Sequence, residues 1–370
     1  LARLLAAAGA EVLVTVAPFP GVDLWSRLRG ELSAVPGLKH VVLVDMSERL
    51  PGPRGEAARA ARAGRVGDPV RAAALRGDLP QHVGLHDFWT LVEAQPADRL
   101  TAGRVISPDD RSSFFCTGGT TGLPKIAVRR HGNEVANAAA VARFMGEAIG
   151  PGKTLFCGLP LFHVNGVLIT GLVPLSTGAH VVLGTPQGYR GDGVVARFWE
   201  IVERFRINFF SGVPTLYAGL LQVPIGSRDV SSLEYGLCGA APMPIEVFRT
   251  FQERTGVAIL EGYGLTEATC VSSINPPAGE RRVGSIGLRL PGQDMEVVRI
   301  DADGAVLGEC ETDEVGLLVV CGPNVFEGYL GAEQNVGVWV DRGDGRRWLN
   351  TGDLARRDAD GYFRLVGRRK

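Results

Sequence analysis

A short loop rich in glycine and threonine carries the strongest chemical signal in the sequence. It follows an apolar segment that ends at Cys116 and comprises Thr117, Gly118, Gly119, Thr120, Thr121, Gly122, Leu123, Pro124 and Lys125. Glycines permit close backbone approach with N–H groups turned inward, while the threonine hydroxyls and the lysine add donors and charge, which suits a polyphosphate. Pro124 before the lysine and Ile126 after it exclude the P-loop NTPase spacing. A Gly/Thr-rich surface turn is the structural alternative.

Other polar residues stand where they could contact a nucleotide or an acid. Tyr263 lies between two glycines, so its ring could stack on a purine, although a tyrosine in a turn is more often simply packed. Thr266 and Glu267 set a hydroxyl beside a carboxylate, which suits a phosphate and a Mg²⁺ ion. Asp353 could accept from a vicinal diol or serve as a β-turn residue. His163 lies in an apolar run, where a histidine is usually a hydrogen-bonded core residue.

The loop and five further segments resemble, in the same order, those of the adenylate-forming superfamily of acyl-CoA synthetases, luciferases and peptide-synthetase adenylation domains. The further segments read LPLFHVNG over 159–166, GAAP over 239–242, EGYGLTE over 261–267, NTGD over 350–353 and GYFRLVGR over 361–368. The chain most resembles the AMP-binding acyl-CoA synthetases.

The resemblance implies a role for each segment. Glu267 would hold Mg²⁺ and Thr266 a phosphate, and with His163 they would be the catalytic residues. Asp353 would accept both ribose hydroxyls, and Arg368 would supply a cation to ribose or phosphate. The implied ATP-binding residues are Thr117, Gly118, Gly119, Thr120, Thr121, Gly122, Lys125, Gly239, Ala240, Ala241, Glu261, Gly262, Tyr263, Thr266, Asp353 and Arg368.

The resemblance also places His163 at the pocket for the carboxylic acid. Members that activate amino acids have an aspartate there, which pairs with the substrate ammonium, so the uncharged aromatic ring disfavours an amino acid. The implied lining is small or apolar, which fits an aliphatic or aromatic acid. It comprises His163, Val164, Asn165, Gly166, Gly212, Val213 and Leu265, with Gly262 beside them.

The activity that the resemblance implies is that of an AMP-forming acid–thiol ligase. A carboxylate attacks the α-phosphate of Mg·ATP to give acyl-AMP and pyrophosphate, and CoA then displaces AMP. Positioning and charge neutralisation at the α-phosphate would carry the catalysis. Two alternatives stay open: an acyl-AMP ligase or loading domain that transfers to a carrier protein, and a nucleotide-binding protein without turnover. A serine-triad enzyme is disfavoured, because the G-x-S-x-G elbow is missing.

Apolar segments alternate with helical patterns over most of the chain. We predict helix, strand, helix and strand over 1–8, 11–16, 24–34 and 40–45, and later strands over 113–116, 207–210, 235–238 and 258–260. From Val283 onward, short alternating strands are expected over 295–300, 315–320 and 361–366. We therefore expect an α/β fold, with doubly wound parallel sheets that have helices on both faces. Residues 1–282 would form the ATP- and acid-binding body, and 283–370 a β-rich, barrel-like subdomain, as in acetyl-CoA synthetase-like folds.

The two chain ends carry expectations of their own. Leu1 opens directly on a helical pattern, and Lys370 stands where the resembled pattern has a hinge to a small C-terminal domain. We expect the start to be truncated and that domain, with a lysine that assists adenylation, to lie outside the chain. Without it, slow acyl-AMP formation and almost no thioester formation are expected.

Composition narrows the class of partner. Lys plus Arg is 39 and Asp plus Glu is 40, a net charge of −1, so the expected partners are small molecules (the acid, ATP and CoA) and not nucleic acid. Six cysteines without a C-x-x-C pair favour a reduced, cytoplasmic protein. The uncharged residues 154–189 contain prolines and histidines, so we predict a buried strand, turn, helix and strand and no membrane span. The Arg-rich residues 51–80 could contact phosphates, but without interleaved aromatic residues we expect a solvated helix or a surface insertion.

Overall fold

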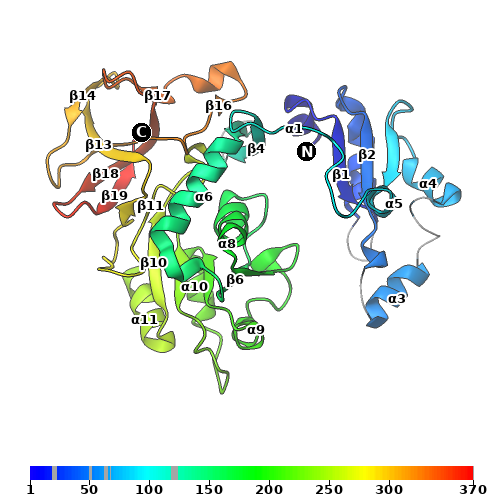
Figure 1. Cartoon of the computed structure of the whole chain (residues 1–370), viewed down its shortest axis with the longest axis horizontal. Helices are drawn as coiled ribbons and strands as arrows, with labels where there is room; N and C mark the ends of the chain where they lie inside the picture. Colours follow the sequence, from blue (N-terminus) through cyan, green and yellow to red (C-terminus); the bar gives the residue numbers. More distant parts are fainter. Residues whose placement is uncertain (19–22, 50–51, 62–65, 67, 118–123, 370) are drawn as a thin grey trace. The chain divides into compact units, whose positions relative to one another are not determined.

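The computed structural model describes residues 1–18, 23–49, 52–61, 66, 68–117 and 124–369. The loop residues Gly118, Gly119, Thr120, Thr121 and Gly122 lie outside the described residues. The chain divides into two compact units, residues 1–105 and 106–370 (Figure 1). The sequence does not reveal this division, because apolar strands alternate with helices on both sides of it.

The first unit is a three-stranded parallel sheet with helices before, between and after its strands. Its order is β1 (Val12–Val16), β2 (His40–Val44) and β3 (Gly84–Asp87). Parallel neighbours need crossover connections, and helices supply them. The helices are α1 (Ala2–Ala7), α2 (Leu24–Arg29), α3 (Gly52–Ala61), α4 (Pro69–Arg76) and α5 (Phe88–Glu93). The helix–strand alternation predicted for this part of the chain is confirmed.

The Arg-rich segment of the first unit is not wholly solvated, which corrects the prediction. Arg71 on α4 is 8% exposed. Its guanidinium lies 2.8 Å from the carboxylate of buried Asp45, at the end of β2. The long stem of an arginine can pack on apolar surface while its guanidinium pairs with a carboxylate. The number of arginines in the segment therefore does not reveal which arginine is buried.

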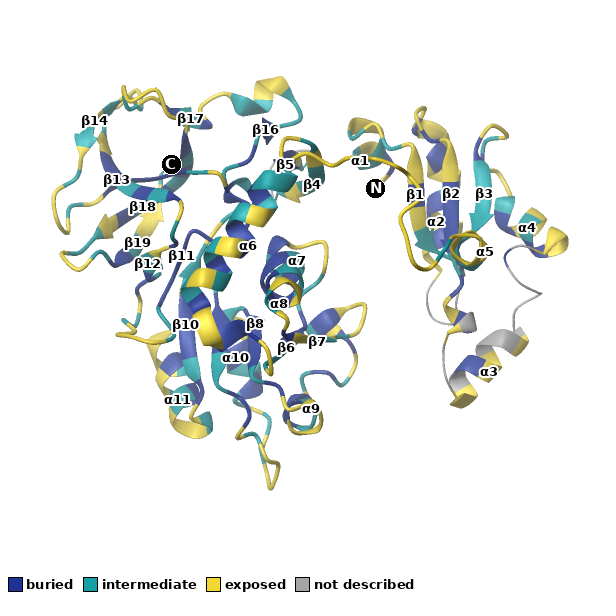
Figure 2. Cartoon of the chain, in the orientation of Figure 1, coloured by how far each residue is buried: buried dark blue, intermediate teal, exposed yellow. Residues whose placement is uncertain are grey.

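The second unit contains a seven-stranded sheet with the order β12-β11-β10-β9-β8-β6-β7 (Figure 1). Five adjacent strands pair in parallel, namely β6 (Thr154–Cys157), β7 (His180–Leu183), β8 (Phe209–Gly212), β9 (Tyr235–Cys238) and β10 (Ala258–Tyr263). Two short antiparallel strands extend one edge, β11 (Ser273–Ile274) and β12 (Leu288–Arg289). Strands β6, β8, β9 and β10 are largely buried (Figure 2), whereas the edge strand β7 is exposed or only partly buried.

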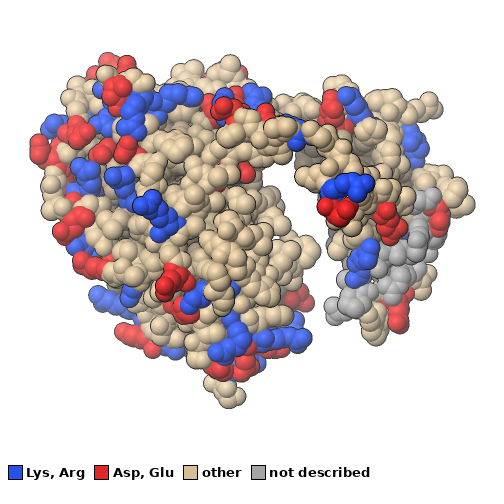
Figure 3. Space-filling view, in the orientation of Figure 1, with Lys and Arg blue, Asp and Glu red and all other residues tan. Residues whose placement is uncertain are grey.

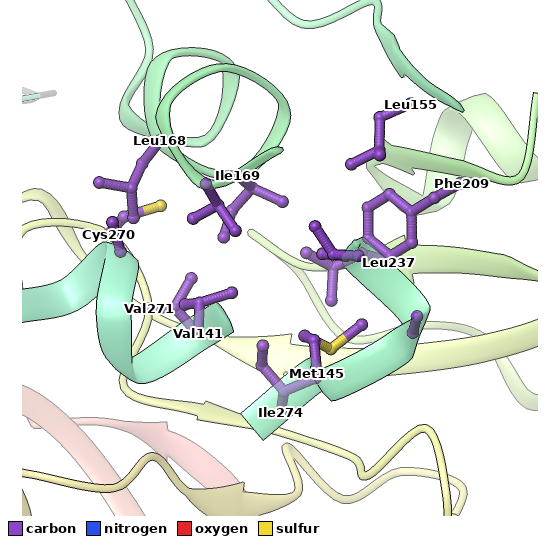
Figure 4. Close-up of a cluster of buried hydrophobic side chains, with 14 of the residues drawn as sticks. Val141, Met145, Leu155, Leu168, Ile169, Phe209, Leu237, Cys270, Val271 and Ile274 are labelled. Carbon is purple, nitrogen blue, oxygen red and sulfur yellow. The ribbon is translucent and has the colours of Figure 1, made fainter. Parts of the chain in front are cut away.

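Successive residues of these strands point to opposite faces, so the sheet has a core on each side. Leu155 and Phe209 pack into one cluster, whereas Phe156 and Phe210 pack into the other. Helices α6 (His131–Met145), α7 (Val164–Val167) and α8 (Val173–Thr177) cover the first cluster. Figure 4 shows Val141 and Met145 of α6 among its side chains. The second is covered by α9 (Phe198–Phe205), α10 (Pro214–Leu220) and α11 (Ile245–Thr255). The doubly wound arrangement predicted from the sequence is confirmed.

The uncharged residues 154–189 fold as predicted. They form β6, a turn, the helical segment from α7 to α8 with a π-helical turn at Leu168–Leu172, and then β7. None of the helices among the described residues has both the length and the apolarity that a bilayer crossing requires.

After β12 the chain forms an antiparallel six-stranded sheet. Its order is β14-β13-β15-β18-β17, and β19 pairs with β18. The strands are β13 (Asp294–Ile300), β14 (Val306–Glu309), β15 (Gly316–Cys321), β17 (Trp339–Val340), β18 (Trp348–Arg357) and β19 (Phe363–Arg368). The β-rich character predicted beyond Val283 is confirmed, and a boundary at 282/283 stays a prediction.

The strand before the Gly/Thr loop departs from the prediction. Strand β4 (Arg111–Thr117) pairs antiparallel with β5 (Lys125–Arg130), which pairs with β16 (Gly328–Tyr329). The expected strand over 113–116 therefore belongs to a separate small sheet and not to the parallel one. Every residue of β4 is exposed or only partly buried, whereas central parallel strands are covered on both faces.

Candidate active site

Several predicted site residues lie where parallel strands end. Gly239, Ala240 and Ala241 follow β9, and Gly262 and Tyr263 end β10. Because β9 and β10 are parallel neighbours, their carboxyl ends meet at one edge of the sheet, where open α/β folds bind ligands. Two cavities occupy this edge.

The first, the Glu267 cavity, has a volume of about 460 Å³. Its lining includes Thr117, His163, Thr266, Glu267 and Arg368 as polar residues. Apolar side chains line the remainder, among them Val164, Leu237, Cys270, Val271 and Ile274, each at most 6% exposed. One cavity thus combines a polar region with an apolar one.

The second, the Asp353 cavity, has a volume of about 620 Å³. Its lining includes Ala240, Ala241, Glu261, Asp353 and Arg368. The segment Gly262, Tyr263, Gly264 and Leu265 lines both cavities. The two cavities therefore share this segment as a common wall.

Three residues predicted for the acid pocket line neither cavity. Gly166 is buried within α7, Gly212 is buried at the end of β8, and Val213 precedes α10. The assignment of these three residues to the acid pocket stays a prediction. Gly166 also has a packing role, because a Cβ there would meet the carbonyl groups of Leu159 and Pro160.

The turn that carries Thr266 and Glu267 is held in an unusual conformation. A side chain at Gly264 would overlap the Cys270 carbonyl, which explains the glycine. Thr266–Ala268 forms a 3₁₀ turn, and Thr269 after it has a left-handed backbone with φ of 69°. Such a conformation persists only where surrounding contacts enforce it.

Buried side chains from distant elements supply those contacts. The Arg129 guanidinium donates to the Thr269 carbonyl at 2.6 Å, and Thr269 Oγ1 donates to the Asn324 carbonyl at 2.6 Å. Arg129 is 1% exposed and pairs with Glu134 at 3.0 Å. The Phe326 N–H donates to the Glu267 carbonyl at 2.9 Å. These contacts leave no local signal in the sequence, because the residues that make them come from β5, α6 and the segment before β16.

Glu267 receives a hydrogen bond from a residue that the sequence analysis did not single out. The Tyr329 hydroxyl, on β16, donates to Glu267 Oε1. The Lys125 ammonium lies 4.8 Å from the centroid of the same ring. Burial and the adjacent Glu267 carboxylate raise the pKa of Tyr329, so its hydroxyl stays protonated and donating. In the sequence, only the pair Gly328 and Tyr329 could indicate a role for this tyrosine. The same pair is equally consistent with a tyrosine that is simply packed in a strand.

Asp353 is also engaged from two sides. The Tyr263 hydroxyl donates to Oδ2 at 2.6 Å, and Arg368 Nε donates to Oδ1 at 2.8 Å. Arg368 stands directly opposite Asp353 in the β18–β19 ladder. Burial, and after it the Asp353 carboxylate, raises the pKa of Tyr263 well above its ordinary value. The predicted cluster of Tyr263, Asp353 and Arg368 is thus brought together.

His163 is the N-cap residue of α7 and lines the Glu267 cavity. Its Nδ1 accepts from the Asn165 N–H at 3.3 Å. The imidazole keeps an exposed edge, yet desolvation by the atoms packed around it lowers its pKa. The neutral ring is therefore the favoured form at neutral pH. Asn165 Oδ1 is buried without a hydrogen-bond partner among the described residues.

Glu261 and Ala240 complete the strand ends. Glu261 is 7% exposed, its Oε2 accepts from the Gly284 N–H at 2.8 Å, and burial raises its pKa. Ala240 has a left-handed backbone with φ of 68° and lines both cavities. Backbone strain of this kind gathers at ligand sites.

The family follows from a comparison with known sequences. The sequence profile described as "AMP-binding enzyme" matches residues 1–330. This chain belongs to the AMP-binding enzyme family. The chain is 42% identical over 292 residues to a marinolic acid–CoA ligase of a Pseudoalteromonas species, covering 77% of this chain and 43% of the relative. It is 34% identical over 321 residues to a sulfoacetate–CoA ligase of Cupriavidus necator, covering 86% of this chain and 58% of the relative.

This AMP-binding enzyme spans about half the length of the curated relatives that it matches. Solved structures share its fold. An anthranilate CoA ligase in complex with anthranoyl-AMP aligns with a TM-score of 0.73 at 23% identity, covering 99% of this chain and 60% of the other. A long-chain-fatty-acid-CoA ligase of Archaeoglobus fulgidus aligns with a TM-score of 0.76 at 22% identity, covering 100% and 64%. The predicted family and fold class are confirmed.

Proposed function

We propose that this AMP-binding enzyme activates a carboxylic acid with ATP and passes the acyl group to CoA. In the first step a carboxylate oxygen attacks the α-phosphorus of ATP, which gives acyl-AMP and releases pyrophosphate. In the second the CoA thiol attacks the acyl carbon, loses its proton and displaces AMP. Relatives named as acid–CoA ligases, at 42% and 34% identity, support this proposal.

The observation that carries the proposal is the pair of cavities that share the wall from Gly262 to Leu265. A nucleoside fits the Asp353 cavity, where a carboxylate accepts from ribose hydroxyls and the Tyr263 ring offers a stacking face. The triphosphate would extend toward Thr117, Lys125 and Thr266. The acid would then occupy the apolar part of the Glu267 cavity, with its carboxylate toward the α-phosphate.

The nucleoside end would use residues of both sheets. Each Asp353 oxygen has a second lone-pair site beyond the one that Tyr263 or Arg368 occupies, so both can still accept from ribose. Gly239, Ala240, Ala241, Glu261 and Gly262 would surround the base and ribose, as the resemblance implies. Ala240 and Gly262 contribute to both cavities, at the junction between base and phosphates.

Glu267 fits a magnesium ion. Mg²⁺ prefers one or two carboxylates and completes its shell with water and substrate phosphates, and Glu267 stands beside the hydroxyl-bearing Thr266 and Thr117. Among the described residues no group of three or more His, Cys, Asp or Glu could form a protein-only metal cage. Bound Mg²⁺ would neutralise charge on the phosphates. Lys125 would add a further positive charge, and residues 118–122 would add backbone donors, as predicted from the sequence.

The apolar part of the Glu267 cavity suits an aliphatic or aromatic acid. Val164, Leu237, Val271 and Ile274 offer contact area without charge, and the neutral His163 imidazole provides no counterion for an ammonium. The free thiols of all six cysteines fit a reduced compartment. We accordingly place the enzyme in the cytoplasm, in the metabolism of fatty or related acids.

Pyrophosphate release tests the proposal. The full-length protein is incubated with Mg·ATP and a panel of short, medium, long and aryl carboxylic acids, with and without CoA. Acid-dependent release that CoA accelerates, together with an acyl-CoA product, is the expected result. If CoA leaves pyrophosphate release unchanged and the acyl group is transferred to a phosphopantetheinyl carrier protein, the acceptor is the carrier protein and not CoA. ATP binding without release for any acid would overturn the proposal.

A further inference from the structure

Tyr329 contacts two groups that the proposed reaction uses, the Glu267 carboxylate and the Lys125 ammonium. Its hydroxyl donates to the Glu267 carboxylate, and its ring face lies under the Lys125 ammonium. One side chain thus contacts the carboxylate assigned to the metal and the lysine that follows the Gly/Thr loop. Tyr329 itself lies outside the segments that carry the family resemblance.

Tyr329 is itself held firmly in place. Its N–H donates to Asn335 Oδ1 at 2.8 Å, and its carbonyl accepts from Asn335 Nδ2 at 2.9 Å. It stands opposite Ala127 in the β16–β5 ladder. The Phe326 ring packs edge-on against it, with centroids 5.1 Å apart. A side chain fixed at the backbone and at the ring can in turn fix the groups that it contacts.

The hydroxyl restricts the Glu267 carboxylate. The last torsion of a glutamate is broad, so an unsupported carboxylate samples many orientations. A donor on Oε1 selects among these orientations and leaves Oε2 for a cation. Partners of this kind orient metal ligands in many sites, and their loss typically lowers metal affinity or activity about 10- to 100-fold.

The ring face acts on the lysine. A cation within about 6 Å of an aromatic centroid is attracted by the ring quadrupole, and the Lys125 ammonium lies at 4.8 Å. Lys125 is the first residue of β5, so its stem starts from the edge of the loop. The ring limits the region that this flexible side chain samples near the phosphates.

We propose that Tyr329 is a positioning residue that sets the Glu267 carboxylate and the Lys125 ammonium around one triphosphate, the carboxylate through its hydroxyl and the ammonium through its ring. The inference rests on the proposed function, because it takes Glu267 as the magnesium ligand. Packing alone would require only the ring, since a phenylalanine has the same shape without a hydroxyl that must find a partner.

Two substitutions separate the hydroxyl from the ring. Tyr329→Phe keeps the ring beneath Lys125 and removes the donor to Glu267, whereas Tyr329→Leu removes both. Tyr362→Phe is the matched control, because the Tyr362 hydroxyl donates to the Glu280 carbonyl at 2.6 Å and lines neither cavity. ATP binding is measured calorimetrically in EDTA, and Mn²⁺ binding to the protein–ATP complex by electron paramagnetic resonance, neither of which requires turnover.

Tyr329→Phe is expected to weaken Mn²⁺ binding to the ATP complex about tenfold and to leave metal-free ATP binding within twofold of wild type. Tyr329→Leu should weaken both, and Tyr362→Phe neither. In a Glu267→Gln background, Tyr329→Phe should cause no further loss of Mn²⁺ affinity. A further loss there would indicate that Tyr329→Phe disturbs the fold and does not act through Glu267. Wild-type Mn²⁺ affinity in Tyr329→Phe, or an equal loss of metal-free ATP binding, would overturn the inference alone. Failure of the wild type to bind ATP would overturn the proposed function with it.

Discussion

The Tyr263 hydroxyl lies 2.6 Å from Asp353 Oδ2 and joins residues 90 positions apart in the sequence. Tyr263 ends a strand of the parallel sheet, and Asp353 belongs to the antiparallel sheet. The bond therefore connects the two sheets of the second unit at the wall between the two cavities. An aspartate fixed in this way presents its remaining lone pairs in a constant direction, as recognition of a ribose diol requires.

The hydrogen bond between Tyr263 and Asp353 predicts that substitution of Asp353 lowers ATP affinity more than substitution of Tyr263. Asp353→Asn removes the charge and one acceptor oxygen, so ATP affinity should fall about 10- to 100-fold, which corresponds to about 1.5–3 kcal/mol for hydrogen bonds to a charged group. Tyr263→Phe keeps the ring that we propose to stack on the base and removes only the hydroxyl that donates to Asp353, so a loss below about tenfold is expected. Isothermal titration with ATP measures both. A larger loss in Tyr263→Phe than in Asp353→Asn would contradict the assignment of Asp353.

Glu267→Gln should separate binding from chemistry. The glutamine keeps the size of the side chain and an oxygen that accepts from Tyr329, but it loses the charge that would attract Mg²⁺. We expect the rate of acid-dependent ATP–pyrophosphate exchange to fall about 10²- to 10³-fold, the range seen when one electrostatic stabiliser is removed. ATP binding in EDTA should be unchanged. Exchange at the wild-type rate would remove Glu267 from the reaction.

Substitution of Arg129 alone is expected to lower the free energy of unfolding. Arg129→Met would leave the Glu134 carboxylate without its buried partner and the Thr269 carbonyl without its donor. Removing one member of a buried ion pair costs about 3–5 kcal/mol in the free energy of unfolding, whereas replacing both members is often close to neutral. Urea unfolding of Arg129→Met and of Arg129→Met combined with Glu134→Leu tests this.

The double variant is expected to recover most of the lost stability but not the exchange activity, because the Thr269 carbonyl still lacks its donor. Arg206→Gln is a suitable surface control, since its pair with Asp229 is exposed and such pairs contribute little. Equal stability of wild type and Arg129→Met would refute a structural role for this ion pair.

His163 predicts a pH dependence of stability. Its folded pKa is lowered by desolvation, so between the ordinary value of about 6.5 and the folded value the unfolded chain binds more protons than the native one. The contribution of His163 to stability is therefore fully present above about pH 6.5 and is lost as the pH falls through the folded pKa. Unfolding of wild type and His163→Gln, compared from pH 7.5 to 5, measures it. The variant should show the flatter profile, and parallel profiles would count against the shift.

Gly264 predicts a steric effect at the turn before Thr266. In Gly264→Ala the new methyl group would overlap the Cys270 carbonyl, and overpacking of this kind costs about 1–3 kcal/mol. Gly219→Ala on α10 is the control, because its nearest neighbour, Val195, is 4.0 Å away. Alanine in a helix interior should stabilise by about 0.5–1 kcal/mol. Thermal unfolding measures both, and a tolerated Gly264→Ala would contradict the described turn.

The sequence by itself determined the class of the fold and most of the candidate residues. Alternating apolar segments and helical patterns are local signals, and they predicted the strands at residues 40–45, 235–238 and 258–260. The chemistry of each motif is also indicated by residues that are close in the chain, as Thr266 and Glu267 are. These properties depend on residues a few positions apart, which a single sequence displays directly.

Only the tertiary structure decided which groups meet. Tyr329 contacts Glu267 across 62 positions of the chain, and Tyr263 contacts Asp353 across 90. No residue spacing in the sequence indicates either contact. The same holds for the strand over 113–116, which pairs in a separate antiparallel sheet, and for Arg71, whose burial its neighbours in the chain do not reveal. Long-range pairing is set by the packing of whole elements, and packing depends on complementary surfaces that no local pattern records.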